Sequence, residues 1–324
     1  MKSVQKILSV LVFGLVTAVP LFSAAQSGAE LYRTDGYRYG KFEASIQMAP
    51  GSGVISSFFL WKNESEISDV YWNEVDIEKF GENCNRFLSN LLYGMPQENH
   101  TSVLETEADL CADFHTYTIE WTPERITWFV DGVQLRESNP EDAAEFEENA
   151  EEGMQFRFNV WVGNASFGGV LDTAVLPVHE FIDWVQYSEY TPGEGDDDTD
   201  FTLSWREDFD STPAGSWLKG NWASPYNLSV HSPQNVTFQD GMAILSLTKE
   251  GEEGYSSPAD TESDTLDTES TTDSEGDDDA GVPDDKVSDD TDSDAGCTCS
   301  AVGSASGADS QMSIPRFLFQ VLFR

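Results

Sequence analysis

Apolar residues stand at every second position between Met154 and Val162. The five are Met154, Phe156, Phe158, Val160 and Val162, and between them lie Gln155, Arg157, Asn159 and Trp161. Successive side chains of a β-strand point to opposite faces, so the segment is predicted to be a strand with one apolar face against a core. Its other face combines amides, a guanidinium and an indole.

The same period of two recurs along most of the chain. It is clear from Phe42 to Met48, from His115 to Trp121 and from Ile126 to Val130, after which Asp131-Gly132 predicts a tight turn. Only residues 139–152 have helical character, and they are so acidic that we expect a surface excursion. The chain is therefore predicted to be all-β, and its aromatic content of 12% suits a sandwich of two sheets.

The two ends of the chain differ from its middle. Two lysines, an apolar run from Ile7 to Phe22 and then Ser23-Ala24-Ala25 have the order of a secretory signal, so residues 1–25 are predicted to be a signal peptide and the protein to be secreted. Residues 26–250 are expected to form one large domain. Residues 251–296 alternate acidic and hydroxyl side chains with almost no large apolar residue, which predicts a disordered acidic spacer.

The four cysteines form two unlike pairs. In an exported chain Cys84 and Cys111 are expected to form a disulfide, and two buried free thiols are the alternative. Cys297 and Cys299 lie in residues 297–324, ahead of an apolar stretch too short to span a bilayer and a terminal arginine. This arrangement weakly resembles the C-terminal sorting tags of some Gram-negative surface proteins, which would retain the protein at the cell surface. An uninformative tail is an equal alternative.

The formal net charge of -42 excludes nucleic acids and anionic membranes as natural partners, whereas a neutral glycan is unaffected by it. The sequence has no zinc-ligand spacing, Gly-rich phosphate loop or Ser-His-Asp arrangement, so no cofactor nucleotide is expected. The four histidines, at 100, 115, 179 and 231, are too scattered in sequence to suggest a site.

The segment Asn73 to Glu78 carries three acids on one strand face. Glu74, Asp76 and Glu78 share a parity, with Val75 and Ile77 on the other. Clustered carboxylates raise one another's pKa, which suits chemistry that needs a protonated and an ionised carboxyl together, such as glycoside hydrolysis. The Cα atoms of the outer two would lie roughly 13 Å apart, so their side chains must lean inward over a concave sheet to approach the ~5 Å of a retaining pair. A solvated acidic face is the alternative.

Other segments fit a sugar site. The polar face of residues 154–162 offers directed hydrogen bonds and an aromatic plane, although an ordinary solvated face is the alternative. Phe59 and Trp61 could offer rings to the same ligand. Residues 191–200 are predicted to be a flexible linker. About fifty residues make only a marginal core alone, so the strands from Phe201 to Glu250 are expected to complete the first domain.

These residues resemble glycoside hydrolase family 16, over about residues 28–247. Besides Glu74 to Glu78, the resembling segments are Ala29–Tyr32, Tyr39–Ala44, Ser65–Ile67, Phe114–Tyr117, Glu120–Pro123, Arg157–Asn159 and Tyr190–Gly193. The resemblance implies a β-jelly roll of two curved antiparallel sheets. It also implies circular permutation, because the counterpart of Phe201 to Thr248 comes first in unpermuted relatives. Residues 191–200 would then join the ancestral termini, since domain termini often lie close together.

By position, the resemblance implies Glu74 as nucleophile, Glu78 as general acid/base and Asp76 as the residue that tunes their protonation. It places further residues in a substrate cleft, namely Glu30, Phe59, Trp61, Asn63, Glu66, Trp72, Asn90, Arg157, Asn159, Trp161, Phe167 and Trp222. The similar family member has tyrosine at Trp61, glutamine at Leu88 and tryptophan at Phe167, so three sugar contacts differ.

The resemblance also implies a structural calcium ion away from the cleft, with no cofactor for catalysis. Its ligands would be Asp183, Asp208 and the backbone carbonyl of Gly241, and hard oxygen ligands of this kind suit calcium.

The activity implied is that of a secreted, monomeric endo-β-glucanase. Its substrate would be mixed-linkage 1,3-1,4-β-D-glucan, such as lichenan or cereal β-glucan, cut at 1,4-β linkages with retention of configuration. No extra residue interrupts Glu74 to Glu78, as it would in the laminarinase branch, and this favours the lichenase-like branch. The alternatives are an endo-1,3-β-glucanase and a non-catalytic glucan-binding jelly roll. Three clustered acids argue against the second, because binding alone does not require them.

Overall fold

The computed structural model of the protein describes residues 25–223 and 227–257. The predicted sorting tag, nearly all of the predicted signal peptide and most of the predicted acidic spacer lie outside these residues. The described part contains seventeen β-strands and one α-helix of eight residues. No helix in this part is long and apolar enough to cross a membrane.

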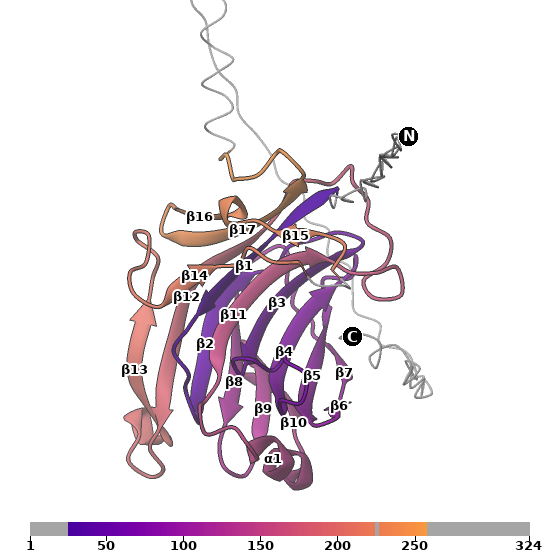
Figure 1. Cartoon of the computed structure of the whole chain (residues 1–324). Coiled ribbons are helices and arrows are strands. Elements are labelled where there is room, and N and C mark those ends of the chain that lie inside the picture. Colours follow the sequence, from indigo (N-terminus) through magenta and orange to yellow (C-terminus); the bar gives the residue numbers. More distant parts are fainter. Residues whose placement is uncertain (1–24, 224–226, 258–324) are drawn as a thin grey trace, which may run out of the picture. The chain divides into compact units, whose positions relative to one another are not determined.

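One sheet, which we name the site sheet, has eight antiparallel strands. In spatial order they are β14 (Trp217–Lys219), β1 (Gln26–Arg33), β11 (Gln155–Val162), β3 (Val54–Trp61), β4 (Trp72–Phe80) and β5 (Arg86–Gly94), with β6 (Gln97–Asn99) and β7 (Ser102–Glu105) side by side along the free edge of β5. The strands curve strongly along their length (Figure 1).

The second sheet lies behind the first. Its strands are, in spatial order, β10 (Val133–Glu137), β9 (Ile126–Val130), β8 (His115–Trp121), β2 (Gly40–Gln47) and β12 (Val178–Tyr190). On the other side of β12, β13 (Phe201–Glu207) pairs with its second half and β17 (Met242–Lys249) pairs with its first half. The sheet ends with β16 (Val236–Gln239), which pairs with β17. The start of β1 also pairs with β17 and, in parallel, with β15 (Val230–His231), which ties the two sheets together. The prediction of an all-β fold of two curved antiparallel sheets is confirmed.

The core lies between the sheets and is built from the predicted apolar parities. Phe156 and Phe158 of β11 are fully buried, and both stack on Phe58 of β3. Phe42 of β2 reaches Phe156 from the opposite sheet, with ring centroids 5.1 Å apart. Burial of each phenylalanine stabilises the fold by about 1.5–3 kcal/mol. These rings therefore stabilise the packing of β3 and β11 against the second sheet.

The acidic segment 139–152 does form a helix, α1 (Pro140–Glu147), which Asn139 caps by accepting a hydrogen bond from the Asp142 amide. The segment is less of an excursion than predicted, because Phe146 is fully buried. Its backbone carbonyl accepts a hydrogen bond from Asn73 Nδ2 (2.6 Å). The helix therefore anchors the start of β4 at one end of the sheets (Figure 1).

Residues 191–200 were expected to be flexible, and the structure differs. They make a hydrogen-bonded loop between the paired strands β12 and β13, with a short 3-10 turn, η1 (Asp196–Asp198). Asp200 accepts a hydrogen bond from the Gly193 amide, and Asp196 accepts one from the Leu203 amide, both at 2.8 Å. The acidic side chains thus bind the loop's own backbone, which composition alone does not reveal.

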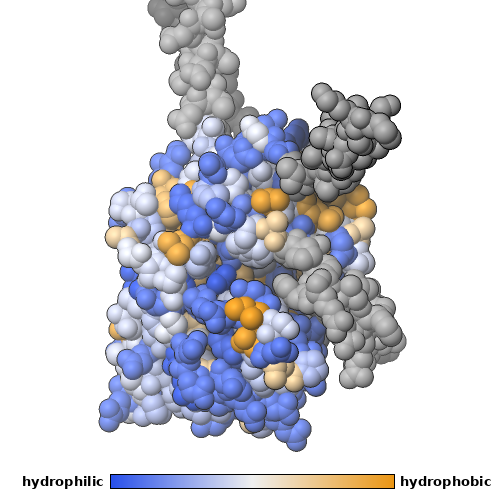
Figure 2. Space-filling model, viewed as in Figure 1, coloured by the Kyte–Doolittle hydropathy of each residue, from blue (hydrophilic) through white to orange (hydrophobic). Residues whose placement is uncertain are grey.

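Packing against the domain also continues beyond Glu250, where the acidic spacer was expected to begin. Glu253 accepts a hydrogen bond from Ser27 Oγ (2.7 Å), and the Tyr255 ring lies edge-on to His179 and Phe181. On the face shown in Figure 2, hydrophilic residues predominate and apolar residues gather in a few separate patches.

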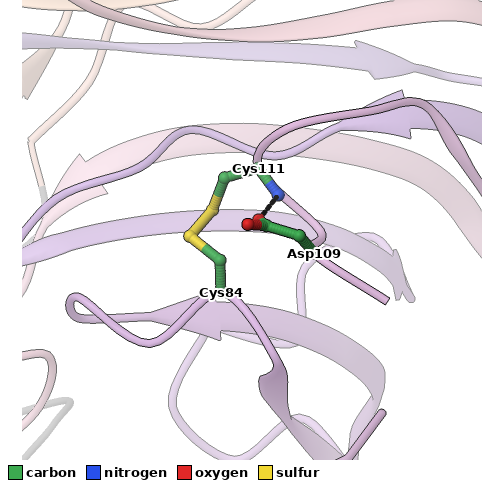
Figure 3. A group of neighbouring side chains, drawn as sticks. All are labelled: Cys84, Asp109 and Cys111. Carbon is green, nitrogen blue, oxygen red and sulfur yellow. Dashed lines mark hydrogen bonds between the residues drawn. A yellow bond between two sulfur atoms is a disulfide. The ribbon is translucent and has the colours of Figure 1, made fainter. Parts of the chain in front are cut away.

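Cys84 and Cys111 form a disulfide, which confirms the predicted pair (Figure 3). It joins the turn after β4 to the segment before β8, and the Cys111 amide donates a hydrogen bond to Asp109 Oδ1 (3.1 Å). Because both sulfur atoms are bonded to each other, Asp109 and the two cysteines do not make a metal site. Closing a loop across 27 residues stabilises the fold by about 3–4 kcal/mol in the chain-entropy view.

Candidate active site

The three acids of β4 lie on the outer face of the site sheet, as their parity predicts. Val75 and Ile77, between them, are fully buried in the core. The register sets the cross-strand neighbours: Glu74 lies between Trp61 and Leu92, Asp76 between Phe59 and Asn90, and Glu78 between Ser57 and Leu88. Each acid therefore has a different environment on the same face.

Glu74 is held by an indole. Trp72 Nε1 donates a hydrogen bond to Glu74 Oε2 at 2.8 Å. Burial raises the pKa of Glu74 to about 7, while hydrogen bonds from Trp72 and Asp76 and the charge of Arg157 act against that rise. These three partners favour the ionised carboxylate, so Glu74 is the acid of the cluster best suited to act as a nucleophile.

Asp76 acts as a proton donor within the cluster. Burial, then the charges of Glu74 and Glu78, raise its pKa well above the usual range, and its hydrogen bond to Glu74 raises it further. Asn90 opposes this rise by hydrogen bonding to Asp76, and the Asn90 amide is in turn oriented by Thr101 Oγ1, which donates to Asn90 Oδ1 at 2.8 Å. The proton on Asp76 thus faces Glu74, and a chain of hydrogen bonds fixes it there.

Of the two glutamates, Glu78 has the higher pKa. Burial and the nearby charge of Glu74 raise its pKa to about 8. The apolar side chain of Leu88, which is 1% exposed, lies directly across from it in β5 and contributes to that burial. The face therefore holds an ionisable Glu74 and a protonated Glu78, the combination that a general acid beside a nucleophile requires.

A second cluster lies on β1 and β11 of the same face. Glu30 is fully buried, and its Oε1 accepts a hydrogen bond from Arg157 Nη1 at 2.9 Å. Its Oε2 accepts a short hydrogen bond from Trp222 Nε1. Gly220 makes room for this arrangement, because a Cβ there would lie 2.6 Å from Glu30 Oε2. Burial raises the pKa of Glu30, and the charge of Arg157 is the largest influence in the other direction.

Aromatic rings line the face between the two clusters. The Arg157 guanidinium lies over the Tyr32 and Trp61 rings, 4.6 and 5.5 Å from their centroids. Trp61 meets Trp72 edge-on at 5.0 Å, and its ring also meets Phe59 edge-on at 6.5 Å. These planes suit the C–H faces of sugar rings.

The remaining predicted residues fall at the margins. Phe167, in the loop after β11, contacts Trp161 at 6.0 Å and stacks on Phe80 of β4 at 5.6 Å. Asn63 and Glu66 lie exposed in the loop between β3 and β4, where the Glu66 carboxylate is close enough to raise the pKa of Glu30. The predicted set therefore extends over one continuous face.

The structure adds residues that the sequence did not single out. Ser57 lies opposite both Glu78 and Asn159 in the register. Ser57 Oγ and Asn159 Oδ1 are buried and have no hydrogen-bond partner within residues 25–223 and 227–257. Tyr32, Thr101 and Gly220 were also missed, and so was His231, which was expected to belong to no site but lies behind Glu30.

The residues of the predicted calcium site converge by register. β17 and β13 pair with neighbouring stretches of β12 on either side of Asp183; Gly241 directly precedes β17 and Asp208 directly follows β13. The oxygen donors fit a hard cation in type. Asp208 Oδ1 accepts a hydrogen bond from Arg206 Nε at 2.6 Å, so a cation would compete with this guanidinium.

The chain is similar to several known proteins. The model of glycosyl hydrolases family 16 matches residues 9–206. A beta-glucanase of Fibrobacter succinogenes is 41% identical over 233 residues, which cover 71% of this chain and 66% of that protein. A beta-glucanase of Brevibacillus brevis is 31% identical over 161 residues, covering 49% and 59%. The chain thus spans at most 66% of the length of these two relatives. A solved Bacillus licheniformis beta-glucanase is 22% identical, with a TM-score of 0.41, over 50% of this chain and 77% of its own.

Proposed function

The chain belongs to glycoside hydrolase family 16, and from that premise we propose that it is an endo-β-glucanase that cuts 1,4-β linkages in mixed-linkage 1,3-1,4-β-D-glucan with retention of configuration. The observation that carries the proposal is the trio of acids on one face of β4, with Glu74 bonded by Trp72 and Asp76 and with Glu78 kept protonated. The beta-glucanase relatives support the substrate class.

In the first step Glu78 gives its proton to the glycosidic oxygen as the bond from that oxygen to the anomeric carbon breaks. The Glu74 carboxylate attacks the same carbon from the opposite side and forms a covalent glycosyl ester. Asp76 stabilises Glu74 before the attack through its hydrogen bond. As Glu74 loses its charge, the pKa of Glu78 falls, which prepares Glu78 for its second role.

In the second step Glu78, now ionised, takes a proton from a water molecule. The resulting hydroxide attacks the anomeric carbon and releases the sugar from Glu74, so that both carboxyls return to their starting states. Two inversions at one carbon give retention. Binding across the face is assigned to Arg157, Glu30, Asn159 and the aromatic rings of Trp61, Trp72 and Trp222.

The test is release of reducing sugar from barley glucan, lichenan, laminarin and cellulose, combined with proton NMR of the first product. Barley glucan and lichenan are expected to be the best substrates, and the first product to be the β-anomer. Faster cutting of laminarin would mean that the specificity is that of an endo-1,3-β-glucanase. An initial α-anomer would show inversion, and binding without any cleavage would leave only the glucan-binding alternative.

Circular permutation is part of the proposal. It is supported by β17, which pairs with both β1 and β12 although it lies beyond the residues that the family model matches. Joining residues 257 and 25 through a short linker and opening the chain within residues 191–200 should therefore give an active enzyme. Loss of folding in such a rearranged chain would count against permutation.

We also propose that Asp183, Asp208 and the Gly241 carbonyl hold a structural calcium ion, away from the acids of β4. Binding to the native state alone would raise the melting temperature as calcium is added, without a change in kcat. Asp183→Asn should abolish that rise.

Export through the N-terminal segment is proposed as well, and the Cys84–Cys111 disulfide supports an oxidising destination.

A further inference from the structure

His231 lies buried directly behind the Glu30 cluster. Its side chain is 1% exposed, and its Nδ1 lies 3.8 Å from Glu30 Oε2. Its ring meets the Trp222 indole edge-on, with centroids 4.7 Å apart. We infer that His231 is a positioning residue for substrate binding, one that fixes the Glu30 carboxylate and the Trp222 ring while touching no sugar itself. The inference rests on the proposed function of this face.

The backbone holds His231 in place independently of its side chain. Its amide donates a hydrogen bond to the Trp222 carbonyl at 3.0 Å, and the two-residue strand β15 pairs with β1 so that His231 stands opposite Gly28. A Cβ at Gly28 would lie 2.6 Å from the Val160 carbonyl oxygen and 3.3 Å from His231 Cδ2, so glycine there allows β1 to pass close to both. The ring is thus set between β1 and the segment that carries Trp222.

The neighbouring Asn227 determines which ring nitrogen carries the proton. Asn227 Oδ1 accepts hydrogen bonds from the Ser229 amide (2.8 Å) and from Ser229 Oγ (2.6 Å), so its Nδ2 must face His231 Nε2, 3.1 Å away. An amide nitrogen only donates, so Nε2 accepts and the single proton of the neutral ring sits on Nδ1. Nδ1 lies on the side of Glu30 Oε2, 3.8 Å away, and has no hydrogen-bond partner within the described residues.

Glu30 accepts hydrogen bonds from Arg157 and Trp222, and His231 Nδ1 lies beside it at 3.8 Å, beyond hydrogen-bond distance. Burial lowers the pKa of His231 to about 3, so the ring stays neutral and keeps the proton on Nδ1 throughout the neutral pH range. Trp222 remains 42% exposed, and its free surface can stack on a sugar only if the ring is held at one angle. His231 supplies that restraint from behind.

The experiment compares two substitutions at His231 with a matched control. His231→Leu keeps an apolar volume but removes the donor, whereas His231→Asn places an amide NH₂ close to the position of Nδ1 and keeps it. His179→Leu is the control, because His179 is also largely buried but lies in the second sheet and bonds Ser246. On a mixed-linkage tetrasaccharide, His231→Leu is expected to raise KM about 5- to 20-fold with kcat within about twofold, and His231→Asn to raise it less than threefold, as loss of ground-state positioning requires.

A second readout does not depend on activity. Tryptophan fluorescence of His231→Leu should differ from that of the wild type, and the difference should vanish when both carry Trp222→Phe. The inference is overturned if His231→Leu leaves KM and fluorescence unchanged, if His231→Asn is as impaired as His231→Leu, or if His179→Leu raises KM equally. If the wild type cuts no β-glucan, the proposed function fails, and the fluorescence comparison alone then decides whether His231 positions Trp222.

Discussion

Carboxyl groups lie in two regions of the same sheet face, and the two regions are stabilised differently. Glu30 on β1 is bonded by a guanidinium and an indole, and the charge of Arg157 opposes the effect of burial on its pKa. The acids of β4 lie close to one another, and the pKa of each is raised by burial. Glu78 and Asp76 are raised further by neighbouring negative charge.

The difference separates two roles. A carboxylate that accepts hydrogen bonds from a guanidinium and an indole is held in one geometry, which suits holding Arg157 and Trp222 for a ligand. Carboxyls that share protons with one another change charge easily, which suits a reaction in which protons move. The comparison predicts that changes on β4 act on kcat and that changes around Glu30 act on KM.

The largest effect is expected at the two outer acids of β4. Glu74→Gln and Glu78→Gln should each lower kcat on barley glucan at least about 1000-fold, because one removes the nucleophile and the other the acid. Circular dichroism should show an unchanged fold. Glu180→Gln is the matched control, a buried carboxyl in β12 outside the site, and it should retain near wild-type kcat. Near wild-type turnover in either β4 variant would show that the proposed catalytic role of that glutamate is wrong.

Asp76 should show an intermediate effect that depends on the substituent. An asparagine keeps an NH donor toward Glu74, whereas an alanine does not. We expect kcat to fall about tenfold in Asp76→Asn and about 100-fold in Asp76→Ala. Steady-state kinetics of the two variants would settle the order. Equal losses would indicate that the charge of Asp76 matters and its donated hydrogen bond does not.

At Glu30 the effect should move to binding. Glu30→Gln removes the charge that pairs with Arg157 but keeps the size of the side chain, and a charge-assisted hydrogen bond contributes about 1–2 kcal/mol. KM should therefore rise about 5- to 30-fold, with kcat within about threefold. A loss confined to kcat would break the division between the two regions.

The smallest effect concerns stability. Glu180 accepts a hydrogen bond from Ser56, and burial raises its pKa from 4.5 to about 8. The native state therefore holds a proton that the unfolded chain releases, so the contribution of Glu180 to stability is present below about pH 4.5 and is lost as the pH rises through about 8. Glu180→Gln should raise the melting temperature at pH 9 by about 3 °C and leave it unchanged at pH 4.5. Differential scanning calorimetry of the variant and the wild type at pH 4.5 and pH 9 measures this effect. If the variant changed the melting temperature equally at both pH values, the prediction would be wrong.

Strand β4 and the face that its three acids share could be predicted from the sequence, because this information is local. A period of two places Glu74 and Glu78 on one face and Val75 in the core, whatever lies beside them. The same reasoning gave the buried and exposed parities of β11. The acidic segment 139–152 was predicted to lie on the surface, but Ala143 and Phe146 of α1 are buried.

The partners of these residues could not be predicted, because the register between distant strands is not written in any local pattern. His231 follows Glu30 by about two hundred residues in the sequence. Only the pairing of β15 with β1 brings the two residues together. Thr101 orients Asn90 only because the chain returns beside β5. The loop at residues 191–200 likewise depends on which amides Asp196 and Asp200 reach.

Azide rescue of the two β4 alanine variants tests the central assignment most directly. When Glu74 is replaced by alanine, azide can enter the space of the missing nucleophile and attack from the α-face, so the product should be an α-glycosyl azide. When Glu78 is replaced, the ester on Glu74 still forms from an activated aryl glycoside, and azide then gives the β-glycosyl azide. Proton NMR distinguishes the two. We expect the α-glycosyl azide from Glu74→Ala and the β-glycosyl azide from Glu78→Ala. The opposite assignment of the two products, or no azide product from either folded variant, would contradict the roles proposed for Glu74 and Glu78.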